Sequence, residues 1–168
     1  MLTAQELEQA KNTKLSKNFT LYELIKSDSY PNHVVYPSQE VIELLTDFCN
    51  KVLQPIRDKF GAIRINSGYR NPRLNKAVGG VSDSVHQILN PDHSEIVLGV
   101  AADIVPLKAD INEVYKYIQD NMENVKTIIM YRRPAVTRTP FIHVDTRIMR
   151  KGRAFLEKIG AGRYIDYK

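Results

Sequence analysis

The spacing of apolar residues changes at Gly61, and this change constrains the fold more than any other feature of the chain. Between Ser38 and Gly61, apolar residues recur every three or four positions, which is typical of a helix packed on a core. These residues are Val41, Leu44, Leu45, Phe48, Val52 and Ile56. After Gly61, apolar and polar residues alternate over positions 63–66, which is typical of a strand. Helices followed by strands predict an α+β fold.

Two capping boxes mark the beginning of the chain. Thr3 is followed by Glu6, and Thr20 is followed by Glu23, at the spacing with which a threonine and a glutamate bond each other's backbone amides. We therefore expect two short N-terminal helices joined by a polar connector.

Further signals predict the elements that follow. Pro55 lacks an amide donor and clashes with the preceding turn, so we expect it to kink or end the long helix. Asp110 is placed to cap a helix over residues 111–122. The remaining predicted strands cover residues 100–105, 127–131 and 141–145. We expect the N-terminal helices to pack on a small antiparallel sheet that carries the chemistry.

The length and composition predict one globular domain over residues 1–168. A chain of 168 residues with 43% hydrophobic residues is long and apolar enough to form a sizeable core. We expect this core over residues 19–147, followed by a basic C-terminal extension over residues 148–168.

Cys49 is the single cysteine of the chain and lies in the apolar helical stretch. A disulfide framework and a cysteine-based zinc site are therefore excluded. We expect Cys49 to be a buried thiol that packs as a small apolar side chain.

The N-terminal residues 1–16 are polar and lack the apolar region of a secretion signal. No stretch is long enough to span a bilayer, so we expect no membrane span. We expect the product to stay in the cytoplasm as synthesised, unless something else releases it.

The net charge of +5 is concentrated near the C-terminus. Residues 147–168 contain seven basic residues against Glu157 and Asp166, which accounts for the whole net charge. This basic tail either binds an anionic polymer, such as nucleic acid or an anionic cell-wall chain, or forms a solvated surface. Nucleic acid is not expected as the main partner, because no nucleic-acid-binding motif accompanies the charge.

Histidine and aspartate side chains are the candidate metal ligands. Catalytic zinc typically takes three such ligands and keeps a fourth position for water. His33 lies in a loop context and is expected to be exposed, whereas His86 follows Ser84 in a polar loop. His143 and Asp103 lie in apolar strands, where a carboxylate is costly unless it is paired or bound to metal. The alternative for His143 is a hydrogen-bonded core imidazole, and the alternative for Asp103 is the cap of a turn; the residues alone leave these interpretations open.

Five motifs occur in a specific order along the chain. They are NSGYRNP at 66–72, NKAVGG at 75–80, SVH at 84–86, GVAADI at 99–104 and HVDTR at 143–147. In this combination they resemble the zinc D-alanyl-D-alanine carboxypeptidases of the M15 peptidase class. The likeness extends from about residue 19 to residue 147.

This resemblance implies a fold, a cofactor and roles for individual residues. The fold would be the small α+β fold that these peptidases share with the hedgehog signalling domain. One zinc ion would be held by His86, Asp103 and His143. Arg70 would bind a carboxylate of the substrate, which its planar guanidinium can meet with two parallel hydrogen bonds. Ser84 would form a hydrogen bond near the metal.

The chain departs from the family pattern after His86. The family has a glycine three residues after this histidine, whereas here residues 87–98 separate His86 from Gly99. We interpret this as an insertion of about ten residues that contains His93, a competing ligand. The spacing before His86 matches the family, so His86 is favoured over His93. The insertion is either a lid over the substrate groove or a surface loop without a function.

A second departure concerns the general base. Several relatives have an acidic residue three to six positions before the last histidine ligand, but positions 137–140 here are Thr, Arg, Thr and Pro. Asp145 is the available carboxylate, and residues two apart on a strand share a face. Asp145 is therefore expected on the side of His143, where it either accepts the proton of a zinc-bound water or orients another group.

Two functions follow from the resemblance. The leading hypothesis is a zinc metallopeptidase that hydrolyses peptide bonds in peptidoglycan stem peptides, as a carboxypeptidase or an endopeptidase and with Asp145 and Arg70 as catalytic residues. It would act on the cell wall as a phage lysin after release. The alternative is a zinc-containing binding or structural module without catalysis, for example in a phage particle. A turnover assay distinguishes the two.

Overall fold

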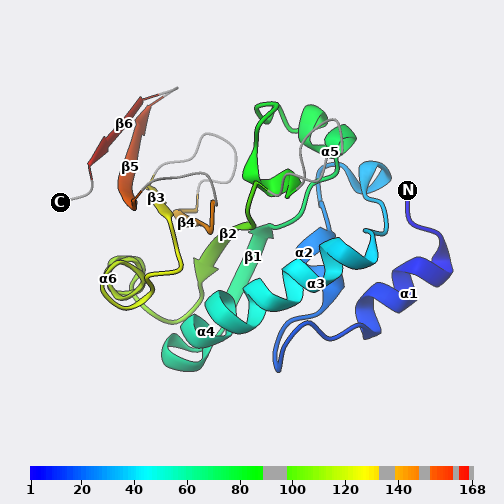
Figure 1. Cartoon of the computed structure of the whole chain (residues 1–168), viewed down its shortest axis with the longest axis horizontal. Helices are drawn as coiled ribbons and strands as arrows, with labels where there is room; N and C mark the ends of the chain where they lie inside the picture. Colours follow the sequence, from blue (N-terminus) through cyan, green and yellow to red (C-terminus); the bar gives the residue numbers. More distant parts are fainter. Residues whose placement is uncertain (89–97, 133–138, 148–151, 161–162, 167–168) are drawn as a thin grey trace.

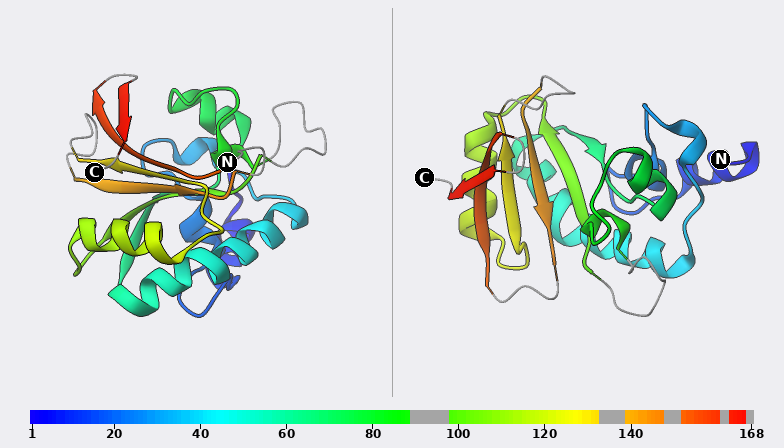
Figure 2. Two further views of the ribbon diagram at one scale, coloured as in Figure 1. Left: turned by 60° about the vertical axis from the view of Figure 1, so that its left-hand side comes forward. Right: turned by 90° about the horizontal axis from the view of Figure 1, so that it is seen from above.

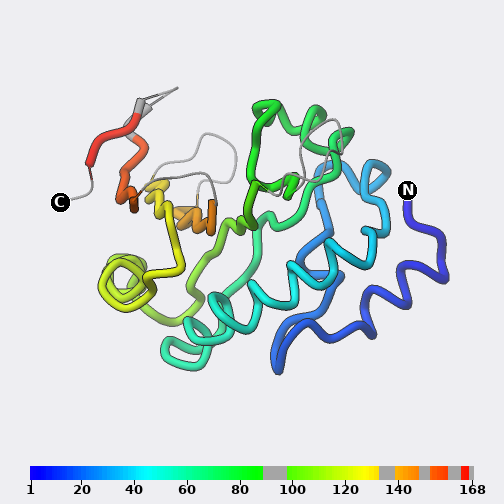
Figure 3. Tube along the Cα trace, in the orientation of Figure 1, coloured from blue at the N-terminus to red at the C-terminus, as the bar shows by residue number. Residues whose placement is uncertain are grey.

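The computed structural model describes residues 1–88, 98–132, 139–147, 152–160 and 163–166. Its helical elements are α1 (Ala4–Asn12), α2 (Leu21–Ile25), η1 (Pro31–His33), α3 (Gln39–Phe48), η2 (Cys49–Leu53), α4 (Gln54–Phe60), α5 (Pro72–Ala77), η3 (Val85–Gln87) and α6 (Ile111–Asn121). Its strands are β1 (Ile63–Ser67), β2 (Ala101–Pro106), β3 (Thr127–Tyr131), β4 (Phe141–Asp145), β5 (Ala154–Gly160) and β6 (Arg163–Asp166). The helix α1 and the strand β6 lie at opposite ends of the molecule (Figures 1 and 3). The α+β fold class is confirmed.

The strands form one six-stranded sheet in the order β1-β2-β4-β3-β5-β6. Neighbouring strands are antiparallel except β3 and β5, which are parallel, so the expected antiparallel sheet is wrong in this one pair. The reason lies in the connection after β4. The Lys126 amide donates to Asp145 at the end of β4, and its carbonyl accepts from Ala154 at the start of β5. The end of β4 and the start of β5 therefore both lie at the beginning of β3, and β5 runs beside β3 in the same direction.

Helices cover one face of the sheet. The helices α3, α4 and α6 lie on this face, whereas α5 lies on the opposite side (Figure 2). Apolar side chains of the central strands point toward the helices and are buried, among them Ile104, Ile128, Met130, Ile142 and Val144. In a strand, the residues between them point to the other face. That second face therefore carries the polar residues of β2 and β4.

The predicted helix starts are confirmed. Thr3 and Thr20 each accept a hydrogen bond from the amide three residues later, and Glu6 and Glu23 complete both capping boxes. Asp110 accepts from two amides at the start of α6. Among the described residues, every helix is too short or too polar to cross a membrane.

Of the two effects expected of Pro55, an end of the helix at this residue is wrong. The long helix does not end there, because a π-helical turn over Cys49–Leu53 joins α3 to α4, and Pro55 falls in the first turn of α4. In a regular helix, the carbonyl of Lys51 would accept the amide hydrogen that proline lacks. Here that carbonyl accepts from the side chain of Asn124 at 3.5 Å. Cys49 is buried, as expected.

The basic C-terminal extension is part of the sheet, through β5 and β6. Arg153, one of its charges, donates hydrogen bonds to the carbonyls at the end of α6, those of Ile118, Gln119 and Met122, and to Val125, at 2.8–3.0 Å. A cation at this position also interacts favourably with the helix dipole. Lys158 lies over the rings of Tyr131 and Tyr164. At least part of the excess positive charge of this extension therefore stabilises the fold.

Candidate metal centre

The register of β2 and β4 brings Asp103 and His143 together. The two residues are direct partners in this antiparallel pair, and both point away from the helix-covered face. Nδ1 of His143 lies 2.9 Å from Oδ1 of Asp103. Their neighbours Ile104 and Ile142 point the opposite way into the core, which fixes the register of the pair.

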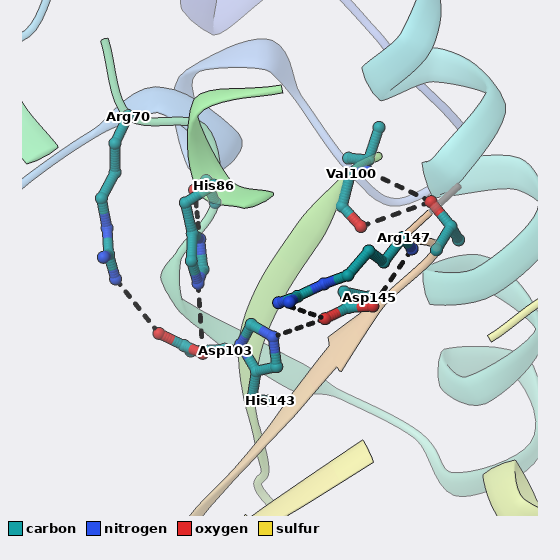
Figure 4. A network of polar contacts seen from close by, with 9 residues as sticks. Arg70, His86, Val100, Asp103, His143, Asp145 and Arg147 are labelled. Atoms are coloured by element: carbon teal, nitrogen blue, oxygen red, sulfur yellow. Dashed lines mark hydrogen bonds and ion pairs between the residues drawn. The ribbon is translucent and has the colours of Figure 1, made fainter. Parts of the chain in front are cut away.

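His86 reaches the same point from the turn η3. Its backbone carbonyl accepts from the amide of Arg70 at 2.8 Å, and its Nδ1 lies 2.7 Å from the carbonyl oxygen of Gly68. Because a carbonyl only accepts, Nδ1 carries the hydrogen and Nε2 presents its lone pair. Nε2 lies 3.5 Å from Oδ1 of Asp103 (Figure 4). Gly68 is required there, since a Cβ would lie 2.4 Å from the carbonyl oxygen of Leu24.

His86, Asp103 and His143 form a compact group of potential ligands. One ligand atom from each residue can be chosen so that all lie within 4.8 Å of one another. The three residues are 5–8% exposed. Two imidazoles and a carboxylate are a typical donor set of catalytic zinc, so these residues fit that ion. His93 belongs to residues 89–97, which lie outside the described part of the chain.

The charges in the group are strongly coupled. Burial raises the pKa of Asp103, but His86 and His143 outweigh burial and bring this pKa far below its usual range. Burial lowers the pKa of His86, which favours the neutral imidazole that binds metal. Burial also lowers the pKa of His143, but its hydrogen bonds to Asp103 and Asp145 outweigh it and raise the pKa to about 9. A metal ion must therefore displace a proton from His143.

Asp145 lies behind His143, on the other side of the imidazole from Asp103. Its Oδ2 is 3.2 Å from Nε2 of His143, and the residue is 0% exposed. Arg147 holds the same carboxylate, with its amide donating to Oδ1 at 3.1 Å and its Nη2 donating to Oδ2 at 3.4 Å. Figure 4 shows this chain of contacts from Arg147 through Asp145 to His143. Nδ1 of His143 is thereby left facing Asp103 and His86.

Arg70 borders the group on the side of β1. Its Nε donates to Oγ of Ser67 at 2.8 Å, and its Nη2 lies 3.3 Å from Oδ2 of Asp103. The guanidinium is thus held beside the candidate ligands. Ser84 starts η3 through its backbone, and its hydroxyl makes no hydrogen bond to the three ligands within the described segments.

For three further residues near the metal group, the sequence predicts no role in the site. Arg147 belongs to the HVDTR motif and to the basic tail, yet it pairs with Asp145. The signal in the sequence that could have indicated this pair is the position of Arg147, two residues after Asp145 on an extended chain. Tyr131 and Phe141 are cross-strand partners whose rings stack at 4.4 Å between centroids. Phe141 lies two residues before His143 on the same strand, so its ring and the stacked ring of Tyr131 lie on the face of the sheet that carries the metal group.

Comparison with known families identifies the chain. The family model described as Peptidase M15 matches residues 17–145, more than half of the sequence and all three candidate ligands. Comparison with the curated proteins and with the solved structures gives no match. Peptidases of this family are zinc-dependent, in agreement with the group of two histidines and one aspartate. The chain belongs to the peptidase M15 family.

Proposed function

We propose that this protein is a zinc-dependent peptidase that hydrolyses peptide bonds in the stem peptides of peptidoglycan. The observation that carries the proposal is the group formed by His86, Asp103 and His143 within the segment that matches the peptidase family. The motif resemblance, which includes Arg70 beside this group, supports peptidoglycan as the substrate. We also propose that the fold is the one shared with the hedgehog signalling domain.

His86 would hold the ion through Nε2 and His143 through Nδ1, because the other ring nitrogen of each faces Gly68 and Asp145, respectively. Asp103 would supply the third ligand. When bound, zinc would lower the pKa of a water to ~7 and polarise the scissile carbonyl. In the overall reaction, the water oxygen adds to the carbonyl carbon, the C–N bond breaks, and a proton passes to the leaving amine.

Arg70 would bind a carboxylate on the leaving side of the substrate. Its Nε is occupied by Ser67, and one Nη2 contact reaches Asp103, so the guanidinium keeps further N–H groups for a ligand. Partial burial strengthens such a charge-assisted hydrogen bond. Ser84 is retained as a candidate for substrate binding through its position next to η3.

We assign Asp145 a positioning role and not the role of general base. Its Oδ2 contacts the ring nitrogen that points away from Asp103 and His86, and both its oxygens are engaged by Arg147. A carboxylate that accepts from a metal-bound histidine fixes the orientation of the ring and increases its basicity. Asp145 therefore acts on the reaction through His143.

A non-catalytic zinc module, for example in a phage particle, remains the second candidate. One observation favours it: among the described residues, the carboxylates at the metal group are Asp103, a candidate ligand, and Asp145, which is paired behind His143. Neither is free to accept a proton from water.

As a peptidase, the protein would act on the cell wall after phage-type release from the cytoplasm. At the wall, part of the basic extension would lie near an anionic wall polymer.

Incubation of the zinc-loaded protein with purified peptidoglycan tests the proposal. Mass spectrometry of the soluble products should reveal peptide fragments released by hydrolysis, and His143→Ala should release none. Equal products from both proteins, or unchanged peptidoglycan, would rule out the peptidase and favour the non-catalytic module. The zinc content of both proteins, measured in parallel, reports on the metal site independently of turnover.

A further inference from the structure

A cleft of about 610 Å³ continues from the metal group past Arg70. Asp103, Arg70 and Phe141 line it beside the metal group. The segment 26–30, which follows α2, also lines it. Such a volume is within the range of sites that bind drug-sized ligands. The space beyond Arg70 is therefore large enough for several residues of a peptide and not only for a terminal carboxylate.

One wall of the cleft is the open edge of the sheet. β1 is an edge strand, and its residues Arg64, Ile65, Asn66 and Ser67 all line the cleft. Consecutive side chains of a strand point to opposite faces, so a cleft on one face would touch only alternate residues. The side chain of Ile65 is packed in the core and is 4% exposed. Ile65 therefore borders the cleft with its backbone.

The hydrogen-bond pattern of β1 shows which of its amides and carbonyls point away from β2. The carbonyl of Ala62 accepts from the amide of Leu107 at 3.0 Å, so this pair is hydrogen-bonded. Such pairs alternate in an antiparallel ladder. The amides and carbonyls of Ile63 and Ile65 consequently point away from β2, and the position opposite Ile63 is Pro106, which has no amide hydrogen. In the parts of the chain that are described, no hydrogen bond reaches the outward groups of Ile65.

The charges around the cleft favour an acidic peptide. Arg64 and Arg70 line the β1 side, and Lys26 lines the cleft from the segment after α2. Lys26 is paired at 3.7 Å with Asp28, whose side chain is 90% exposed. Asp103 is a candidate metal ligand, so the cations are in excess over the carboxylates that face the peptide. A chain segment that carries carboxylates complements this lining.

We propose that the substrate continues through this cleft as an extended segment that adds to the edge of β1, which makes the protein an endopeptidase. The inference rests on the proposed peptidase function and assigns its substrate: an acidic peptide with several residues beyond the cleaved bond. Main-chain hydrogen bonds to Ile65 bind the leaving segment in any sequence, as in other complexes where a peptide joins a sheet edge. Arg70 then binds a carboxylate within the chain and not its end.

The products from peptidoglycan provide the first test. Mass spectrometry should identify a leaving-side fragment of two or more residues, or a cut cross-link. Release of single amino acids from peptide ends would overturn the endopeptidase assignment and leave the peptidase function intact. Absence of any product would overturn the peptidase function itself, and the assignment with it.

Two synthetic peptides with the same acyl side, one with a single residue and one with several residues after the cleaved bond, provide the second test. The longer peptide should have a kcat/KM at least about tenfold higher, the ratio that ~1.4 kcal/mol of extra binding gives. Ser29→Trp, which adds a large ring to the lining of the cleft, and Arg64→Ala should reduce this preference. Arg73→Ala removes an exposed arginine outside the cleft and should leave it unchanged. Equal kcat/KM values for the two peptides would contradict the inference.

Amide hydrogen exchange tests the edge-strand geometry without catalysis. In the metal-chelated protein, addition of the longer peptide should slow the exchange of the Ile65 amide, because it gains an acceptor. The shorter peptide should have little effect. Exchange of Ile65 that is unaffected by the longer peptide, while other residues of the cleft respond, would show that the peptide does not bind along β1.

Discussion

Asp145 accepts a hydrogen bond from the imidazole of His143 on the side opposite to Asp103, with 3.2 Å between Oδ2 and Nε2. The contact lies within one strand, between residues two apart, and the carboxylate is fully buried. It therefore fixes which nitrogen of His143 is directed toward His86 and Asp103. Arg147 in turn fixes Asp145 through its amide and its guanidinium.

Replacing Asp145 by asparagine should weaken zinc binding about 10–100-fold, the usual effect of losing the carboxylate behind a metal-bound histidine. Competition with a chromophoric chelator measures this affinity. Asp120→Asn, which alters an exposed carboxylate paired with Lys116, should have no effect. Unchanged zinc affinity combined with lost turnover would instead indicate that Asp145 is the general base.

His86→Ala should abolish tight zinc binding, because one of three ligands is lost and the neighbouring carboxylate loses its partner. Zinc content after dialysis against a weak chelator is the measurement. His33→Ala is the matched control, since His33 contacts Tyr30 away from the metal group. If the His86 variant retained stoichiometric zinc, another residue such as His93 would have to be the ligand.

Arg70→Lys should lower kcat/KM for the peptide by about tenfold to a hundredfold, corresponding to a charged hydrogen bond of ~1.5–3 kcal/mol. A lysine keeps the charge but cannot bond Ser67 and a carboxylate with a planar fork. Steady-state kinetics with the synthetic peptides measure the loss, and Arg73→Lys serves as the control. Equal kinetics for the Arg70 variant and the wild type would exclude a bidentate role.

The stability of the metal-free protein should depend on the charge of His143. Because hydrogen bonds with Asp103 and Asp145 raise its pKa from 6.5 to about 9, the folded state binds this proton more tightly than the unfolded state. The resulting stabilisation is complete below about pH 6.5 and is lost as the pH rises through about 9. The Tm of the chelated protein should therefore fall over this interval.

Zinc-loaded protein should lack this decrease, since a metal-bound ring nitrogen carries no proton. The His143→Asn variant, which cannot titrate here, should also lack it after chelation. Differential scanning calorimetry at several pH values makes the comparison. A parallel decline in all three samples would show that another group is responsible.

Gly99→Ala should destabilise the protein by more than the ~1–3 kcal/mol that a strained backbone conformation costs. Gly99 has φ +126°, and an added Cβ would lie 2.8 Å from Cα of Arg147, the residue that holds Asp145. Gly61→Ala is a matched control, with φ +80° and no atom within 4 Å of the added Cβ. Chemical denaturation should show the larger loss for the Gly99 variant; equal losses would mean that the contact with Arg147 relaxes.

Much of the fold could be predicted because its signals are local. Thr20 and Glu23 lie within one turn, and Ile63 and Ile65 report their face by simple alternation. The pairing of β3 with β5 has no such signal, since it joins distant segments and β5 contains Glu157 and Lys158. Pairings of this kind are decided by tertiary packing.

For the candidate site, the ligand group could be predicted from the sequence, but the role of Asp145 could not. The ligand group was inferred from the order of the motifs, and the structure brings these residues together across the insertion after His86. The sequence could not decide between the two roles of Asp145, because residues two apart on a strand share a face without revealing which ring nitrogen they meet. That choice depends on the rotamer of His143 and on Arg147, which are properties of the packed structure.

The parallel strand β5 lies directly against β3, beyond the segment that matches the peptidase family. A protein shortened to residues 17–145 would expose the backbone edge of β3, together with the carbonyls at the end of α6 that Arg153 covers. Exposed strand edges promote association between molecules. The segment that matches the family and the smallest stable folding unit therefore have different boundaries, and expression of residues 17–145 alone would yield an aggregation-prone protein.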